Sequence, residues 1–195
     1  QVFALINGHI EAGAYEQNLE VLPKLVQEKE FRSLNCHQKG KIFHKIGVTC
    51  YLLNQEEEAI RYFRDSVLAI WQNCAEVPPT EKATTIYNMG ICHQYLGNNE
   101  DAKKFLDEAL FIFENDPDYP AFDLAKKFQG IGNFYLDNYD SFRAELYYES
   151  ALNIFREIEG TEWRRFDILN QFLIMSIDFK KYELAEQYFE EALAL

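Results

Sequence analysis

The chain has 195 residues, of which 48% are hydrophobic and 15% aromatic, so it is too apolar for a disordered protein. Its net charge of −13 argues against the clustered basic surface that binding to nucleic acid or to an anionic membrane requires. No apolar run approaches the roughly 18 residues that suggest a membrane span, and no signal peptide is recognisable. Because the sequence begins at Gln1 and stops within an apolar pattern, we expect it to be an excised fragment.

The four cysteines, Cys36, Cys50, Cys74 and Cys92, form no CxxC pair. The sequence also contains no N-glycosylation triplet. We therefore expect free thiols in a reducing compartment and a cytoplasmic location.

The first predicted element is a helix over residues 14–31, inside an N-terminal region, residues 1–33, that is less regular than the rest. Its Asn18, Leu22 and Leu25 match the spacing of positions 41 residues later, in the second helix of the next segment. We interpret this region as a truncated or irregular repeat that keeps only its second helix.

Four segments with one common pattern follow and fill residues 34–195. Three of them are centred on a glycine, with spacings of 43 and 42 residues, and the fourth has Leu173 at that position. An alanine follows 12 residues later in every segment. The segments span about 34–76, 77–118, 119–160 and 161–195, with glycines at Gly47, Gly90 and Gly132 and alanines at Ala59, Ala102, Ala144 and Ala185. Four copies in one register are the signature of a repeat protein.

Each segment is predicted to form two helices joined by a short polar turn. In the first segment, Phe43, Ile46, Gly47 and Cys50 fall at i, i+3, i+4 and i+7, which is one face of a helix. The glycine of the first helix and the alanine of the second are small enough to let the two helices approach closely. Large residues around them are expected to fill the core.

This pattern resembles the tetratricopeptide repeat (TPR). The third copy is the most similar, with Phe128, Ile131-Gly132, Tyr135, Ala144, Tyr148 and Ala151 at the family's positions. The period exceeds the common TPR value of about 34 residues and is similar to that of the longer repeats in kinesin light chains, bacterial peptide sensors and proteins with a caspase-like CHAT peptidase domain. The resemblance covers residues 34–195 and implies an all-α, right-handed solenoid of antiparallel helix pairs.

In TPR arrays the first helices line the concave groove, so the resemblance implies a set of solvent-facing groove residues. By copy these are Lys41, His44, Val48, Tyr51 and Leu52; Thr84, Tyr87, Ile91, Gln94 and Tyr95; Lys126, Gln129, Asn133, Leu136 and Asp137; and Asp167, Asn170, Ile174, Ile177 and Asp178. Exposed aromatic and apolar groups rimmed by polar ones are typical of interaction surfaces. The alternatives are that some of them pack on neighbouring helices, or that the convex face or loops bind instead.

The C-terminal half is the more acidic one. Residues 98–195 carry 21 acidic and 10 basic residues, against 11 and 9 in residues 1–97. We expect a partner with Lys or Arg over Asp137, Asp167 and Asp178, although acidic faces also simply maintain solubility.

No residue pattern in the chain predicts catalysis, a metal or a cofactor. Cys92 and His93 are adjacent on one helix and point about 100° apart, so neither activates the other. Cys36, His37 and His44 lack a fourth ligand at a recognisable spacing, and no glycine-rich phosphate loop follows a strand. We do not expect an enzyme.

The function that the sequence predicts is a scaffold that binds a protein or peptide segment in the groove. One alternative is a regulatory or substrate-recognition arm of a larger enzyme, such as a CHAT peptidase, in which the groove contacts other parts of the same chain. Another is self-association, because the ends of a repeat array expose faces that caps normally cover.

Overall fold

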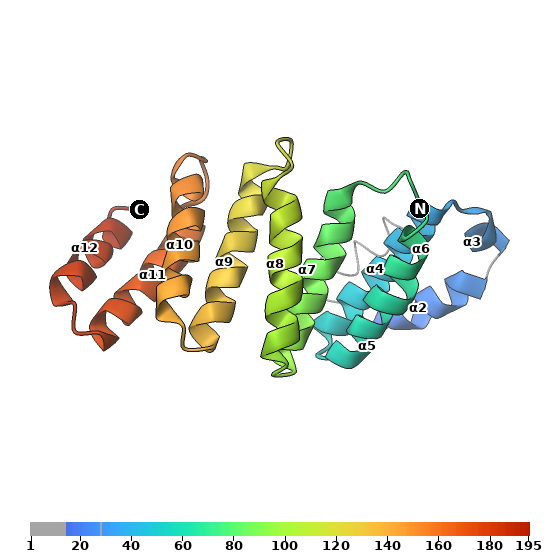
Figure 1. Cartoon of the computed structure of the whole chain (residues 1–195), viewed down its shortest axis with the longest axis horizontal. Helices are drawn as coiled ribbons and strands as arrows, with labels where there is room; N and C mark the ends of the chain where they lie inside the picture. The colour runs from blue at the N-terminus through green and yellow to red at the C-terminus, as the bar shows by residue number, and fades with distance from the viewer. Residues whose placement is uncertain (1–14, 28) are drawn as a thin grey trace. The chain divides into compact units, whose positions relative to one another are not determined.

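The computed structural model describes residues 15–27 and 29–195, and over these residues the fold is all-α (Figure 1). The predicted helix at residues 14–31 corresponds to two shorter helices, while residues 1–14 and 28 lie outside the described part. The helices are α2 (Tyr15–Gln27), α3 (Lys29–Ser33), α4 (Cys36–Leu52), α5 (Glu56–Arg61), α6 (Ala69–Trp71), α7 (Pro79–Tyr95), α8 (Asn99–Glu114), α9 (Ala121–Asp137), α10 (Ser141–Arg156), α11 (Glu162–Asp178) and α12 (Tyr182–Leu193), with a π-helical stretch η1 (Tyr62–Leu68) between α5 and α6.

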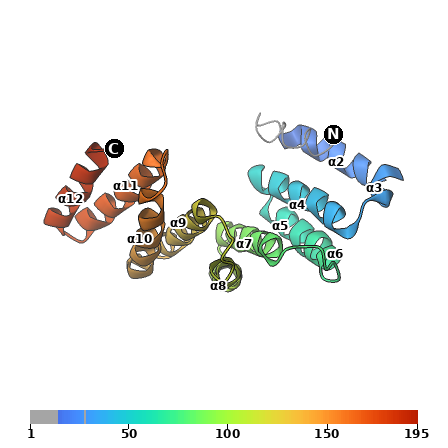
Figure 2. The ribbon, with the colours of Figure 1, turned by 90° about the horizontal axis from the view of Figure 1, so that it is seen from above.

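The chain divides into two compact units, Gln1–Asp116 and Pro117–Leu195. In the first unit α4 packs against α5, η1 and α6, α7 packs against α8, and α2 runs beside α4 (Figure 2). In the second unit α9 pairs with α10, α11 pairs with α12, and α10 contacts α11. Each of the four predicted copies therefore forms a helix pair.

Residues directly before three of the first helices fix where these helices begin. Asn35 caps α4: its side chain accepts the N–H of Gln38 at 2.8 Å, and the Gln38 side chain accepts the N–H of Asn35 at 3.2 Å. Pro78 and Pro120 precede α7 and α9, where a fixed φ suits the entry into a helix.

The glycines of the repeat make room for side chains of the second helices. A Cβ added at Gly47 would lie 2.5 Å from the Phe63 ring, and one at Gly132 would lie 2.6 Å from the Tyr148 ring. Both rings are fully buried as a result. In the fourth copy Leu173 occupies the glycine position, and Phe189, the counterpart of Tyr148, is exposed.

The expectation of four free thiols is wrong for one pair. Cys36, the first residue of α4, and Cys74, just after α6, form a disulfide with their Cα atoms 6.0 Å apart. The sequence gives no sign of it, because 38 residues separate the two and only helix pairing brings them together. Cys50 and Cys92 are free and buried, as expected.

Among the residues that the structure describes, no helix is long and apolar enough to cross a membrane.

Candidate interaction surface

The first helix of a repeat is buried on two opposite sides, which α7 shows clearly. Ala83, Tyr87 and Gly90 form one buried face, and Thr85, Met89 and Cys92 form the other. The prediction that Tyr87 faces solvent is therefore wrong: it is only 8% exposed. A helix that packs on one neighbour keeps one broad solvent-exposed face. A helix with neighbours on both sides keeps only a narrow exposed strip of side chains.

That strip follows the spacing i, i+4, i+7, i+11, and we call it the A-helix stripe. None of its members is buried. They are Lys41, Lys45, Val48 and Leu52 on α4; Thr84, Asn88, Ile91 and Tyr95 on α7; Lys126, Gly130, Asn133 and Asp137 on α9; and Asp167, Gln171, Ile174 and Asp178 on α11. Four members were not among the predicted groove residues, although each lies four residues after a predicted one: Lys45, Asn88, Gly130 and Gln171.

Polar residues on or beside the stripe in the first unit form contacts between α4 and α7. The Nδ1 atom of His44 on α4 lies 2.9 Å from the hydroxyl of Thr85 on α7. Glu81 on α7 accepts from His37 at 2.8 Å and pairs with Lys41 at 3.1 Å. Burial alone would raise the pKa of Glu81, but the hydrogen bonds from His37 and Lys41 outweigh it and lower the pKa. These contacts hold α4 against α7. Lys41 can therefore contact a partner only through the part of its side chain that remains exposed.

An aromatic pair marks the C-terminal end of the stripe in the first unit. The rings of Tyr51 and Tyr95 lie 5.8 Å apart. Burial, and then the hydrogen bond to Tyr95, raises the pKa of Tyr51 well above its ordinary value. Tyr95 itself is 65% exposed. Val48 and Ile91, both half-buried, continue this apolar surface along α4 and α7.

In the second unit the predicted residues fall into two groups. Gln129 accepts a hydrogen bond from Arg164 at 3.1 Å, and Asn133 accepts one from the hydroxyl of Tyr148 at 2.8 Å. Lys126 pairs with Asp123 at 2.6 Å, so its charge is already compensated. The remaining residues are exposed, namely Asp137, Asp167, Asn170, Ile174, Ile177 and Asp178. This part of the surface is therefore acidic with exposed isoleucines, while half-buried Leu136 adds little exposed area. In the first unit, Gln94 is likewise half-buried.

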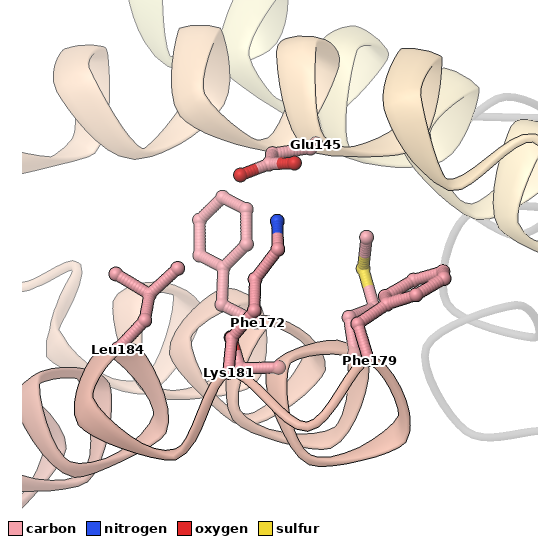
Figure 3. Close-up of a pocket in the computed structure, with 7 residues that line it drawn as sticks. Glu145, Phe172, Phe179, Lys181 and Leu184 are labelled. Carbon is pink, nitrogen blue, oxygen red and sulfur yellow. The ribbon is translucent and has the colours of Figure 1, made fainter.

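A small cavity in the second unit does not qualify as a ligand site. It lies between α10, α11 and α12, at Ser176, where the third copy has Tyr135 (Figure 3). Its volume is about 10 Å³, which is room for roughly one water molecule. Lys181 extends toward Glu145 at its edge (Figure 3).

The side chains considered for catalysis or metal binding are buried, stacked on a ring or disulfide-bonded. Cys92 is buried, and burial raises the pKa of its thiol to about 12, the opposite of what a nucleophile needs. The ring of His93 stacks on Phe105 at 5.3 Å. Cys36 is bonded to Cys74. Within residues 15–27 and 29–195, no group of three or more His, Cys, Asp or Glu side chains could hold a metal ion.

Antiparallel helix pairs in register, with small residues at their crossings and a free stripe on the first helices, define a helical-repeat protein. Residues 83–116 match the family model described as tetratricopeptide repeat, which confirms the resemblance to TPR proteins for that part of the chain. A comparison with curated proteins gives no significant match.

Solved structures extend the agreement in fold to the whole chain. BtubC (BKLC) from P. vanneervenii is 18% identical, with a TM-score of 0.80 over 100% of this chain and 78% of that one. The TPR-like repeats of a putative kinesin light chain from Podosopora anserina are 15% identical, with a TM-score of 0.73 over 98% and 91% of the two chains. MamA is 14% identical, with a TM-score of 0.67 over 97% and 92%. At these identities the likeness shows the fold, and the fold is that of a TPR array.

Proposed function

We propose that this protein is a non-enzymatic scaffold that binds a protein or peptide segment along its A-helix stripe. TPR-like folds are typical of protein-interaction scaffolds, which supports the general class. The finer proposal rests on one observation: Tyr95 and Ile174, large apolar side chains, stand exposed at stripe positions of α7 and α11. Tyr95 lies against Tyr51 on one side, but most of its side chain is exposed, and exposed aromatic and apolar groups among polar ones favour binding.

The chemistry of the expected partner follows from the charges beside the stripe. Asp167 and Asp178 flank Ile174 on α11, and the Lys126 charge is offset by Asp123. A segment with apolar anchors and Lys or Arg over the second unit fits this surface, with the charges acting mainly on orientation and on-rate.

A capture experiment with matched variants tests the proposal. Wild-type protein, Tyr95→Ala and Phe111→Ala are immobilised, and proteins retained from lysate are quantified by mass spectrometry. Phe111 lies on the second helix α8 and is 68% exposed, against 65% for Tyr95, so the control removes an equally exposed aromatic ring. A purified retained protein is then titrated against all three.

The expected result is a partner whose affinity falls at least about tenfold with Tyr95→Ala and is unchanged with Phe111→Ala. Ile174→Ser tests the second unit separately and is expected to weaken binding of a partner that contacts α11. A partner that binds all variants equally, or that is lost only with Phe111→Ala, would place the interaction away from the stripe and refute the proposal.

Self-association is the second candidate, and one feature favours it. A cleft of about 130 Å³ opens between α11 and α12 and is lined by Phe166, Leu169, Asn170, Leu173, Phe189, Ala192 and Leu193. In the third copy the corresponding face is covered by the next helix, because Tyr148, the counterpart of Phe189, packs its ring against Phe172 of α11 at 5.9 Å. Sedimentation of the protein and of Leu193→Lys distinguishes the cases: a concentration-dependent dimer that the variant abolishes supports self-association. The regulatory-arm alternative has no comparable feature in the described residues.

The cytoplasmic location stays a prediction, and the disulfide bears on it. Disulfides persist mainly in oxidising compartments. The oxidation state of Cys36 and Cys74 in protein isolated from its source under thiol-trapping conditions tests the location: two trapped reduced thiols support the cytoplasm, and an intact bond contradicts it.

A further inference from the structure

One surface of the second unit departs from all its counterparts within the chain. Tyr139, in the turn before α10, and Phe142 and Leu146, on α10, are 95%, 80% and 53% exposed. We call these three residues the α10 patch. At 100° per residue, Phe142 and Leu146 lie about 160° and 200° around the helix from the buried Ala144, so they point away from α9.

The other three copies have no apolar side chain at these positions. The counterparts of Phe142 are all glutamates, Glu57, Glu100 and Glu183; those of Leu146 are Arg61, Lys104 and Gln187; and those of Tyr139 are Asn54, Gly97 and Lys180. The repeat architecture therefore does not require apolar residues at any of these positions.

The backbone makes Tyr139 unfavourable where it stands. Its φ is 60°, in the left-handed region that bulky residues rarely adopt. Two of its counterparts, Gly97 and Asn54, are residue types that tolerate this conformation, with φ values of 73° and 56°, whereas the third, Lys180, has a φ of 57° and is as unfavourable a type as tyrosine. Because the Tyr139 side chain is almost fully exposed, no burial in the fold compensates for the strain.

Phe142 also lacks a favourable interaction with the helix dipole that its counterparts make. Glu57, Glu100 and Glu183 lie in the first turns of their helices, where a carboxylate interacts favourably with the helix dipole. The first turn of α10 contains no acidic residue, and the carboxylate at this helix start comes instead from the N-cap Asp140, which accepts the N–H of Arg143 at 3.1 Å. The α10 patch thus combines an unfavourable backbone conformation at Tyr139 with exposed apolar surface at three positions, and such a combination is characteristic of a binding surface.

The charges beside the patch indicate its partner. Glu145 and Glu149 lie next to it on α10, and after burial their charges are the leading cause that raises the pKa of Tyr188. Arg143 on α10 is paired with Asp140 at 3.3 Å, and Lys181 extends toward Glu145 (Figure 3). Residues 117–195 contain 15 acidic and 8 basic residues, so the surroundings are also negative.

We propose that the α10 patch is a second docking surface, distinct from the A-helix stripe, for a protein segment that carries apolar anchors flanked by Lys or Arg. The anchors cover Tyr139, Phe142 and Leu146, and the basic residues face Glu145 and Glu149. This surface operates whether or not the stripe binds a partner.

A displayed library of random peptides of about 16 residues tests the proposal, with selection on the wild-type protein and counter-selection on a triple variant. The variant Tyr139→Asn/Phe142→Glu/Leu146→Lys carries residues that already occupy these positions in sister copies. It should therefore melt no lower than the wild type. A lower melting temperature would show that the three side chains support the fold and would overturn the proposal.

Selected peptides are synthesised and their binding is followed by fluorescence anisotropy. We expect apolar residues with adjacent Lys or Arg, a loss of at least about tenfold with Phe142→Glu alone, and no change with Tyr95→Ala. Affinity should fall as salt rises from about 50 to about 500 mM, because the pairing with Glu145 and Glu149 is exposed.

Three results of the peptide experiments would also overturn the proposal. Either no peptide survives counter-selection, or the survivors lack basic residues and ignore salt, or Tyr95→Ala abolishes their binding too. A dimer of the wild type that the triple variant abolishes in sedimentation would assign the patch to a second copy of the chain instead. Binding to phosphatidylserine vesicles would assign it to a lipid surface.

Discussion

The Cys36–Cys74 disulfide allows a quantitative prediction for the first unit. The bond spans 38 residues, and restricting an unfolded chain over such a loop is expected to stabilise the folded state by about 4 kcal/mol. Replacing both cysteines by serine removes this contribution and leaves the packing of the neighbouring helices in place. With a urea m-value of about 2 kcal/mol/M, the midpoint of unfolding should fall by about 2 M.

Tryptophan fluorescence can report this unit alone. The chain has two tryptophans, and Trp163 lies in the second unit, so Trp163→Phe leaves Trp71 as the single probe. Trp71 is buried close to the bond, with its indole N–H donating to the carbonyl of His37 at 3.4 Å. Urea titrations are run on this protein and on its Cys36→Ser/Cys74→Ser derivative, each with and without reductant.

Reductant should lower the midpoint of the parent to that of the derivative and should leave the derivative unchanged. A midpoint shift below about 0.3 M, with the bond verified by mass, would refute the argument from loop closure. Four reactive thiols in the denatured, unreduced protein would refute the bond itself.

The remaining predictions concern the core. Gly132→Leu should lower the unfolding free energy by about 1–3 kcal/mol, since even a Cβ would lie 2.6 Å from the Tyr148 ring; an unchanged thermal melt would contradict this contact. Tyr148→Phe should cost about 1 kcal/mol in urea denaturation, because the 2.8 Å hydrogen bond to Asn133 is lost, and an equal midpoint would show that this bond is energetically neutral. Burial raises the pKa of Cys50 to about 11 and that of Cys92 to about 12, so at pH 8 both should react with a disulfide reagent only on unfolding; rapid labelling of the folded protein would argue against their burial. In the unfolded chain these thiols ionise near pH 9, as model thiols do, so their contribution to stability falls as pH rises from about 9 to about 11 for Cys50 and to about 12 for Cys92.

Much of the fold could be predicted from the sequence because helix pairing in a repeat is local. Gly47, Gly90 and Gly132 mark where the first helix receives a large side chain of the second, and both helices lie within about 40 residues. The candidate surface was predicted less well. Its general location follows from the helical period, but Tyr87 is buried because α7 has neighbours on two sides, which one helix's pattern does not reveal.

The sequence by itself determined the helix pairs, since these depend on residue spacings that each pair carries within it. Only the tertiary structure decided which residues of a first helix remain accessible, because that depends on the helices on both sides. It also decided that Cys36 pairs with Cys74, since their approach depends on how α4 packs against the end of α6. The tertiary structure also decided the exposure of the α10 patch. The sequence shows apolar residues at the three positions, and the packed helices show that nothing among the described residues buries them.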